Sequence, residues 1–377
     1  MRVTAVRIFH VLPRWTFVAV DTDAGITGYG EPVVEGQSRV VEAAVQHFAE
    51  YLVGKDPLEI ERHWQVMYRG GFYRGGAVGV SAISGLEHAL WDIKGKFYGA
   101  PVFEMLGGRA RDRMRMYGHG RGTTDADFVD AALRAKARGL TAIKIGIDGP
   151  ARDLESLDYV DRQVRRFAAV RDAVGPAFDI AVDMHGRTTP ATAKRIIAGF
   201  EPYHPLWVEE PCLPENVDAM LDIASSTTVP IASGERRFTK WEFRELIDRR
   251  AVSVIQPDLC HAGGILEAKK IAAMAEAQYI SVAPHNPLGP ISLAACLQLD
   301  ACTPNFMIQE HPTADDGADL GVGLLSEPFE IVDGFIDVPT GPGLGIQPDE
   351  DLFVERRYPG DWRNPVFVHE DGGHGDW

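Results

Sequence analysis

Two patterns of apolar and polar residues divide the chain. Residues 1 to about 33 alternate between apolar and polar positions, and a short turn containing Asp and Gly joins Phe17–Val20 to Ile26–Gly30. This alternation predicts an antiparallel hairpin. Apolar positions then recur at helical spacing over Val40–Leu52 and, more strongly, over Ser81–Phe97. We therefore expect two helices that each bury one face.

From about Arg113 onward, short apolar runs alternate with helical periodicity. The pattern predicts seven helices between eight strands, which lie near residues 113–118, 141–146, 178–183, 206–210, 230–234, 252–256, 279–283 and 306–309. Alternating strands and helices favour a parallel sheet, and this number of strands favours a barrel. No helix of ordinary length follows Glu310.

The expected fold class is α/β, a modified (β/α)7β TIM-type barrel with an α+β capping domain built from both ends of the chain. We place the barrel at residues 113–325 and the main part of the cap at residues 1–112. Residues 326–377, which are rich in Gly and Pro, are expected to return to the cap.

Six ionisable residues stand at the carboxyl ends of six consecutive expected strands. They are Asp183, Glu209, Glu235, Asp258, His285 and Glu310. In a barrel the strand-to-helix loops converge on one mouth, so these side chains should meet there. Three carboxylates that meet repel one another unless a cation lies between them. The spacing therefore predicts a metal enzyme with Asp183, Glu209 and Glu235 as the metal ligands.

The chemistry of this set points to Mg²⁺ and to a histidine base. Three oxygen ligands without Cys or His suit a hard cation, which can stabilise the enediolate formed when an α-proton leaves a carboxylic acid. His285 is the best candidate for the base, and Asp258 can accept a hydrogen bond from its other ring nitrogen. Alternatively the acidic residues are helix N-caps, a role for which Glu209 and Glu235 are poorly suited.

Two further residues are candidates for the same mouth. His185 lies two residues after Asp183, so in extended backbone both side chains point the same way, and His185 could protonate a departing hydroxide. The alternative is a loop histidine bonded to the backbone. As a neutral acid, Glu310 could donate to a substrate carboxylate, or it could be a surface strand end. Residues 369–374 are interpreted as a solvated tail because flexible glycines do not fix metal geometry.

Composition limits the classes of partner. The 377 residues carry a formal net charge of −16, which argues against nucleic acid and anionic membranes. The four cysteines have no paired spacing and are predicted to be buried, reduced thiols of a cytoplasmic protein; they are Cys212, Cys260, Cys296 and Cys302. We expect no signal peptide and no membrane span. The predicted partners are a small-molecule substrate and further copies of the chain in a homo-oligomer.

Several motifs carry a resemblance to a known family. They include Ala82–Ile93 (AISGLEHALWDI), Asp183-Met184-His185 and Val208-Glu209-Glu210-Pro211. The chain resembles the mandelate racemase branch of the enolase superfamily, and within it the dehydratases of acid sugars. The resemblance implies Mg²⁺-dependent loss of water from an acid sugar, with D-galactonate as the favoured substrate. It also implies that Lys144, Glu310 and His185 contact the substrate.

Alternatives to this activity stay open. In the racemases of the branch a second lysine acts as a base on the opposite face, but here the strand ends Lys144-Ile145-Gly146. Gly146 has no side chain that could take a proton, which disfavours a racemase or epimerase. Another aldonate, such as D-gluconate or a pentonate, could be the substrate because sister enzymes use the same framework. A barrel kept only for binding has no need of ligands, base and acid together.

Overall fold

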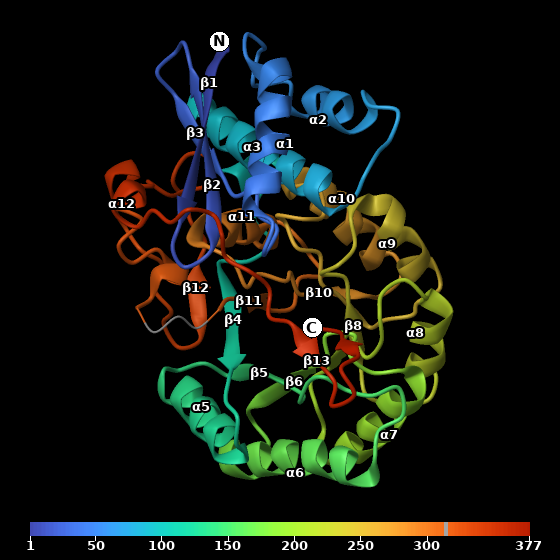
Figure 1. The fold of residues 1–377 in the computed structure, drawn as a ribbon. Helices are drawn as coiled ribbons and strands as arrows, with labels where there is room; N and C mark the ends of the chain where they lie inside the picture. The colour runs from blue at the N-terminus through green and yellow to red at the C-terminus, as the bar shows by residue number, and fades with distance from the viewer. Residues whose placement is uncertain (313–315) are drawn as a thin grey trace.

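A cap of strands and helices lies over a barrel in the computed structural model, which describes residues 1–312 and 316–377 (Figure 1). The cap sheet is antiparallel in the order β1 (Val3–Val11), β2 (Trp15–Thr22) and β3 (Thr27–Gly30). Four helices accompany it: α1 (Ser38–Leu52), α2 (Ile60–Arg69), α3 (Ala77–Tyr98) and the short α4 (Val102–Met105). The predicted hairpin is β2–β3, and the two predicted helices are α1 and α3.

Eight strands and the seven helices between them form the barrel, as predicted. The elements are β4 (Arg113–Gly120), α5 (Asp125–Ala137), β5 (Ala142–Gly146), α6 (Leu157–Val174), β6 (Asp179–Asp183), α7 (Pro190–Phe200), the 3-10 turn η1 (Glu201–Tyr203), β7 (Val208–Glu209), α8 (Val217–Ala224), β8 (Ile231–Ser233), α9 (Thr239–Asp248), β9 (Val254–Ile255), α10 (Ile265–Glu276), β10 (Ser281–Val282), α11 (Pro290–Ala301) and β11 (Gln309–Glu310). Strands β4 to β10 pair in sequence order, each parallel to the next. The ring closes because β11 pairs with β4 and a parallel bridge joins Val282 to Phe306.

One buried side chain from each strand or its flank fills the inside of the barrel. The set is Tyr117, Ala142, Ala181, Trp207, Ala232, Val254, Ala283 and Ile308. Tyr117 and Trp207 meet edge to face with their ring centroids 5.6 Å apart. Alanines on four of the other strands or their flanks leave room for these two rings, which gives a packed floor beneath the mouth.

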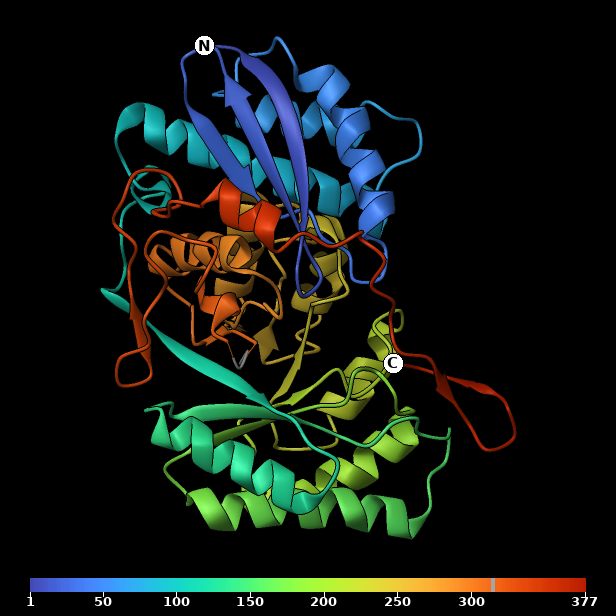
Figure 2. The ribbon, with the colours of Figure 1, turned by 60° about the vertical axis from the view of Figure 1, so that its left-hand side comes forward.

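The last part of the chain contacts both the barrel and the cap. Strand β12 (Phe335–Asp337), which follows the 3-10 turn η2 (Ala318–Leu320), pairs antiparallel with β4. Helix α12 (Glu350–Glu355) lies against the cap, where Arg7 contacts Glu350. Strands β13 (Phe367–Val368) and β14 (His374–Gly375) form a hairpin beside the barrel (Figure 2). The tail at residues 369–374 is therefore part of a hairpin. The domain limits at residues 112 and 325 stay a prediction.

Two buried carboxylates of the cap hold the amino ends of two barrel helices. Glu31 accepts hydrogen bonds from the backbone N–H groups of Gly289 and Ser292, both at 2.8 Å, where α11 begins. Glu87 of α3 accepts from the N–H of Ile265 at 2.8 Å, where α10 begins. The N–H groups and dipole of a helix start attract an anion. Burial nevertheless raises the pKa of Glu31 to about 8 and that of Glu87 to about 7.

These contacts fix the cap over the end of the barrel at which the strands finish.

All four cysteines are free and buried, as predicted. Within residues 1–312 and 316–377, no helix combines the length and the apolar character that a membrane span requires.

Candidate active site

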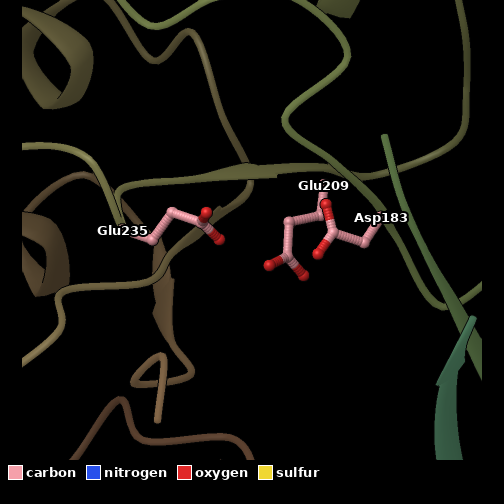
Figure 3. A group of neighbouring side chains, drawn as sticks. All are labelled: Asp183, Glu209 and Glu235. Atoms are coloured by element: carbon pink, nitrogen blue, oxygen red, sulfur yellow. The ribbon is translucent and has the colours of Figure 1, made fainter. Parts of the chain in front are cut away.

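Three carboxylates gather at the mouth of the barrel, as the strand spacing predicts. Asp183 ends β6, Glu209 ends β7, and Glu235 follows β8 by two residues (Figure 3). One oxygen atom of each lies within 4.8 Å of the others. No other group of this kind is found among the residues that the structure describes. The carboxylate trio is typical of a divalent metal site.

The charge distribution fits a cation between these carboxylates. Burial, and then the neighbouring charge of Asp183, raise the pKa of Glu209. Burial also raises the pKa of Glu235, whose Oε2 atom is buried and makes no hydrogen bond. A buried anionic oxygen that makes no hydrogen bond is costly, and a divalent ion held by oxygen ligands would remove that cost. The donor set therefore suits a hard divalent cation.

Lys144 on β5 links this trio to Glu310 on β11. Its Nζ atom lies 2.7 Å from Oε1 of Glu209, 2.6 Å from Oε1 of Glu310 and 3.3 Å from Oδ2 of Asp183. Burial alone would lower the pKa of Lys144, but the surrounding carboxylates raise it well above its usual value. Lys144 is therefore a charged ammonium group in the mouth.

His285 and Asp258 form a buried pair beside the trio. Nδ1 of His285 lies 2.8 Å from Oδ2 of Asp258, whose Oδ1 accepts from the N–H of Cys260 at 2.7 Å. The other ring nitrogen, Nε2, lies 3.4 Å from Oε2 of Glu235. Burial opposes a charged imidazole, but Glu235, Glu310 and Asp258 together raise the pKa of His285. The predicted contact between Asp258 and His285 is confirmed.

His185 approaches Asp183 by a route that differs from the prediction. Its backbone is left-handed, with φ 49°, rather than extended. The tight turn nevertheless brings Nε2 to 3.0 Å from Oδ2 of Asp183. The guanidinium of Arg187 donates to Nδ1 at 3.0 Å, and because a guanidinium has no acceptor, the proton of a neutral His185 stands on Nε2. The charge of Asp183 raises the pKa of His185.

Glu310 is fully buried and is therefore no surface strand end. Its Oε2 atom accepts from the N–H of Asn286 at 2.9 Å, and Oε1 lies 2.5 Å from Nε2 of His119. Burial would raise the pKa of Glu310, but Lys144, His285 and His119 lower it well below its usual value. The three basic groups around this carboxyl thus favour its ionised form, which differs from the neutral acid expected from the sequence.

His119 and Arg187 are two site residues that the sequence reasoning missed. His119 stands near the carboxyl end of β4. The pattern of ionisable residues at the ends of the other strands could therefore have predicted it. Arg187 follows His185 by two residues, but only the folded turn brings its guanidinium to Nδ1.

Comparisons with known proteins agree with this arrangement. The family model described as mandelate racemase / muconate lactonizing enzyme, N-terminal domain, matches residues 9–107, and the one described as enolase C-terminal domain-like matches residues 127–352. The chain belongs to this family of the enolase superfamily. A D-galactonate dehydratase of Variovorax paradoxus (strain S110) is 46% identical over 382 residues, covering 100% of both chains.

Solved structures of the family share the whole fold. A mandelate racemase/muconate lactonizing enzyme from Jannaschia sp. CCS1 superposes with a TM-score of 0.90 at 32% identity, covering 98% of this chain and 100% of that one. An enolase from Agrobacterium radiobacter, with bound Na and L-malate, superposes with a TM-score of 0.91 at 31% identity, covering 100% of both chains.

Proposed function

We propose that the chain is a Mg²⁺-dependent hydro-lyase that converts D-galactonate into 2-dehydro-3-deoxy-D-galactonate and water. The observation that carries the proposal is the pair of histidines beside one carboxylate trio. Nε2 of His285 lies 3.4 Å from Oε2 of Glu235, and Nε2 of His185 lies 3.0 Å from Oδ2 of Asp183. The relative from Variovorax paradoxus, named D-galactonate dehydratase, supports the choice of substrate.

His285 takes the proton from C2. The carboxylate of Asp258 accepts the Nδ1–H hydrogen bond, so the lone pair of a neutral His285 stands on Nε2, which faces the mouth. When Nε2 takes the proton, the negative charge of Asp258 stabilises the imidazolium that results.

Asp183, Glu209 and Glu235 would hold Mg²⁺, which supplies Lewis-acid stabilisation of the charge that develops on the substrate carboxylate. Lys144 adds a fixed positive charge in the same place and is held there by Glu310. In this proposal Glu310 acts by orienting Lys144 and by keeping its ammonium group charged. Because these charges are fixed before the reaction, little reorganisation is needed when the enediolate forms.

His185 completes the elimination. As the enediolate collapses, the C3–O bond breaks and its electron pair leaves with the hydroxyl oxygen. The proton on Nε2 of His185 goes to that oxygen, so water departs instead of hydroxide. The enol that remains then tautomerises to the 2-keto acid: C3 takes a proton and the 2-hydroxyl oxygen loses one.

Another aldonate, such as D-gluconate or a pentonate, is the second candidate substrate. The same base, acid and trio would serve it, since the stereocentres beyond C3 take no part in the reaction. A racemase or epimerase needs a base on each face of C2, and Gly146 leaves the strand-β5 face without one.

A panel of epimeric acid sugars tests the assignment. The purified chain is incubated with Mg²⁺ and with D-galactonate, D-gluconate and pentonates, and 2-keto acid formation is measured. We expect D-galactonate to give the highest kcat/KM. A higher value for another aldonate would move the assignment to that sugar, and no keto acid from any of them would overturn the dehydratase.

A further inference from the structure

Residues 361–377 cross from the cap to the barrel loops beside the mouth. At the cap, the guanidinium of Arg14 lies 5.0 Å from the ring centroid of Trp362. At the barrel, Gly375 packs so closely on Pro150, which follows β5, that a Cβ there would lie 2.4 Å from the proline Cβ. Figures 1 and 2 show the chain passing from α12 to a point between cap and barrel, with the hairpin β13–β14 beside it.

Two aromatic residues of this segment contact the turn that carries His185. The ring centroids of Trp377 and His185 are 6.3 Å apart. The guanidinium of Arg187 lies 5.2 Å from the ring centroid of Phe367. Trp362 extends the contact, because its ring centroid lies 6.3 Å from that of Trp377. The segment therefore touches both His185 and the residue that bonds its Nδ1 atom.

The turn needs such support. His185 and Gly186 are both left-handed, with φ of 49° and 67°. For a residue with a side chain this backbone is unfavourable and persists only where the surroundings hold it. The side chain of His185 keeps 36% of its surface exposed even with Trp377 beside it. Without the segment, the ring would lose its contact with Trp377 and keep those with Arg187 and Asp183.

We propose that Trp377 and Phe367, within the segment of residues 361–377, form the outer wall of the substrate site on the His185 side and are positioning residues for the acid. This inference rests on the proposed function. Trp377 packs beside the imidazole ring, whose Nε2 atom lies 3.0 Å from Oδ2 of Asp183. Phe367 holds the guanidinium of Arg187, which in turn keeps the proton of His185 on Nε2.

The rates of C2 proton exchange and of 2-keto acid formation, measured in the same sample, distinguish a positioning role from a loss of fold stability. In deuterated buffer, the exchange of the C2 proton reports on His285, whereas 2-keto acid formation also needs His185. We expect Trp377→Ala to lower keto acid formation by roughly ten- to a hundred-fold, because small misplacements of a reacting group are costly, and to lower C2 exchange by less than about three-fold. Phe367→Ala should shift the ratio of the two rates in the same direction.

The matched control is Val366→Ala in the same segment, whose side chain is exposed. It should leave both rates near those of the wild type. A parallel fall of both rates in Trp377→Ala would mean that the segment only stabilises the fold, and two unchanged rates would mean that the wall has no role. Either result overturns the inference.

A second readout does not depend on turnover. The N–H of Gly186 donates to the carbonyl of Glu210 at 2.8 Å, and the N–H of Arg187 donates to that of Met184 at 3.0 Å. Amide hydrogen exchange at these two positions should be faster in Trp377→Ala than in the wild type and in Val366→Ala. If the wild type acts on no acid sugar, the proposed function fails but this comparison still stands. Equal amide hydrogen exchange in all three proteins would contradict the proposal that Trp377 supports this turn.

Discussion

Nδ1 of His285 lies 2.8 Å from Oδ2 of Asp258, and this contact decides which ring nitrogen can act as a base. Asp258 is completely buried, and its second oxygen accepts from the N–H of Cys260, so the carboxylate cannot turn away. Burial would raise the pKa of Asp258, but His261, His285 and the N–H of Cys260 lower it below its usual value. An ionised Asp258 keeps the proton of a neutral His285 on Nδ1 and leaves the lone pair on Nε2.

Asp258→Asn should therefore reduce both C2 exchange and keto acid formation by about 10²–10⁴-fold, since the amide cannot stabilise the imidazolium. Steady-state kinetics and NMR exchange measure the two rates. Asp319→Asn is the matched control, because Asp319 also bonds the Nδ1 atom of a buried histidine, His311, at 2.8 Å. Equal losses in both variants would show that any buried Asp–His pair has this effect through stability.

Removal of the metal should abolish turnover. Glu235→Gln takes away one charge from the trio, so Mg²⁺ binding measured by calorimetry should weaken and turnover should nearly vanish while the circular dichroism spectrum is kept. Glu327→Gln, at an exposed position, is the control and should bind Mg²⁺ like the wild type. Full activity in excess chelator would contradict the metal assignment.

His185→Asn should separate the two halves of the reaction. Loss of the acid leaves hydroxide as a poor leaving group, so keto acid formation should fall by about 10²–10⁴-fold. Exchange at C2 should survive much better, because His285 and Asp258 are unchanged. If exchange falls as far as dehydration does, His185 is needed before the proton leaves and is not simply the acid.

The pH dependence of stability should reflect Glu31. Its pKa is raised in the fold to about 8 from 4.5, chiefly by burial, so the folded chain holds a proton that the unfolded chain has lost. The free energy of unfolding should thus fall as pH rises from about 4.5 to about 8. Glu31→Gln should flatten this slope in urea titrations at pH 5 and pH 8, whereas Glu327→Gln should not. An unchanged slope in Glu31→Gln would exclude Glu31 as its source.

The sequence predicts the barrel and most of its mouth because both follow from the regular alternation of strands and helices along the chain. Six consecutive strand ends are marked by ionisable residues, so Asp183, Glu209 and Glu235 could be brought together by counting strands and helices alone. The prediction fails where the position of a side chain depends on distant packing. His119 and Lys144 surround Glu310 and keep it ionised, which no single strand reveals.

Other features depend on tertiary contacts between distant segments. The left-handed turn at His185 breaks the alternation used to aim its side chain, yet the ring still reaches Asp183. The contact between Trp377 and His185 joins residues far apart in the sequence, and no local pattern marks it. Such contacts become visible only when the cap, the barrel and the last segment are placed together.

In the proposed reaction, one base removes the C2 proton and one acid then expels the 3-hydroxyl. Incubation of the wild type with D-galactonate and Mg²⁺ in deuterated buffer, followed by NMR, tests it most directly. We expect the 2-keto acid to form, and any substrate that exchanges at C2 to keep its configuration, because His285 returns the proton to the face that it left. His285→Asn should show neither exchange nor keto acid. Accumulation of the C2 epimer faster than the keto acid would reveal a second base despite Gly146 and would contradict the account.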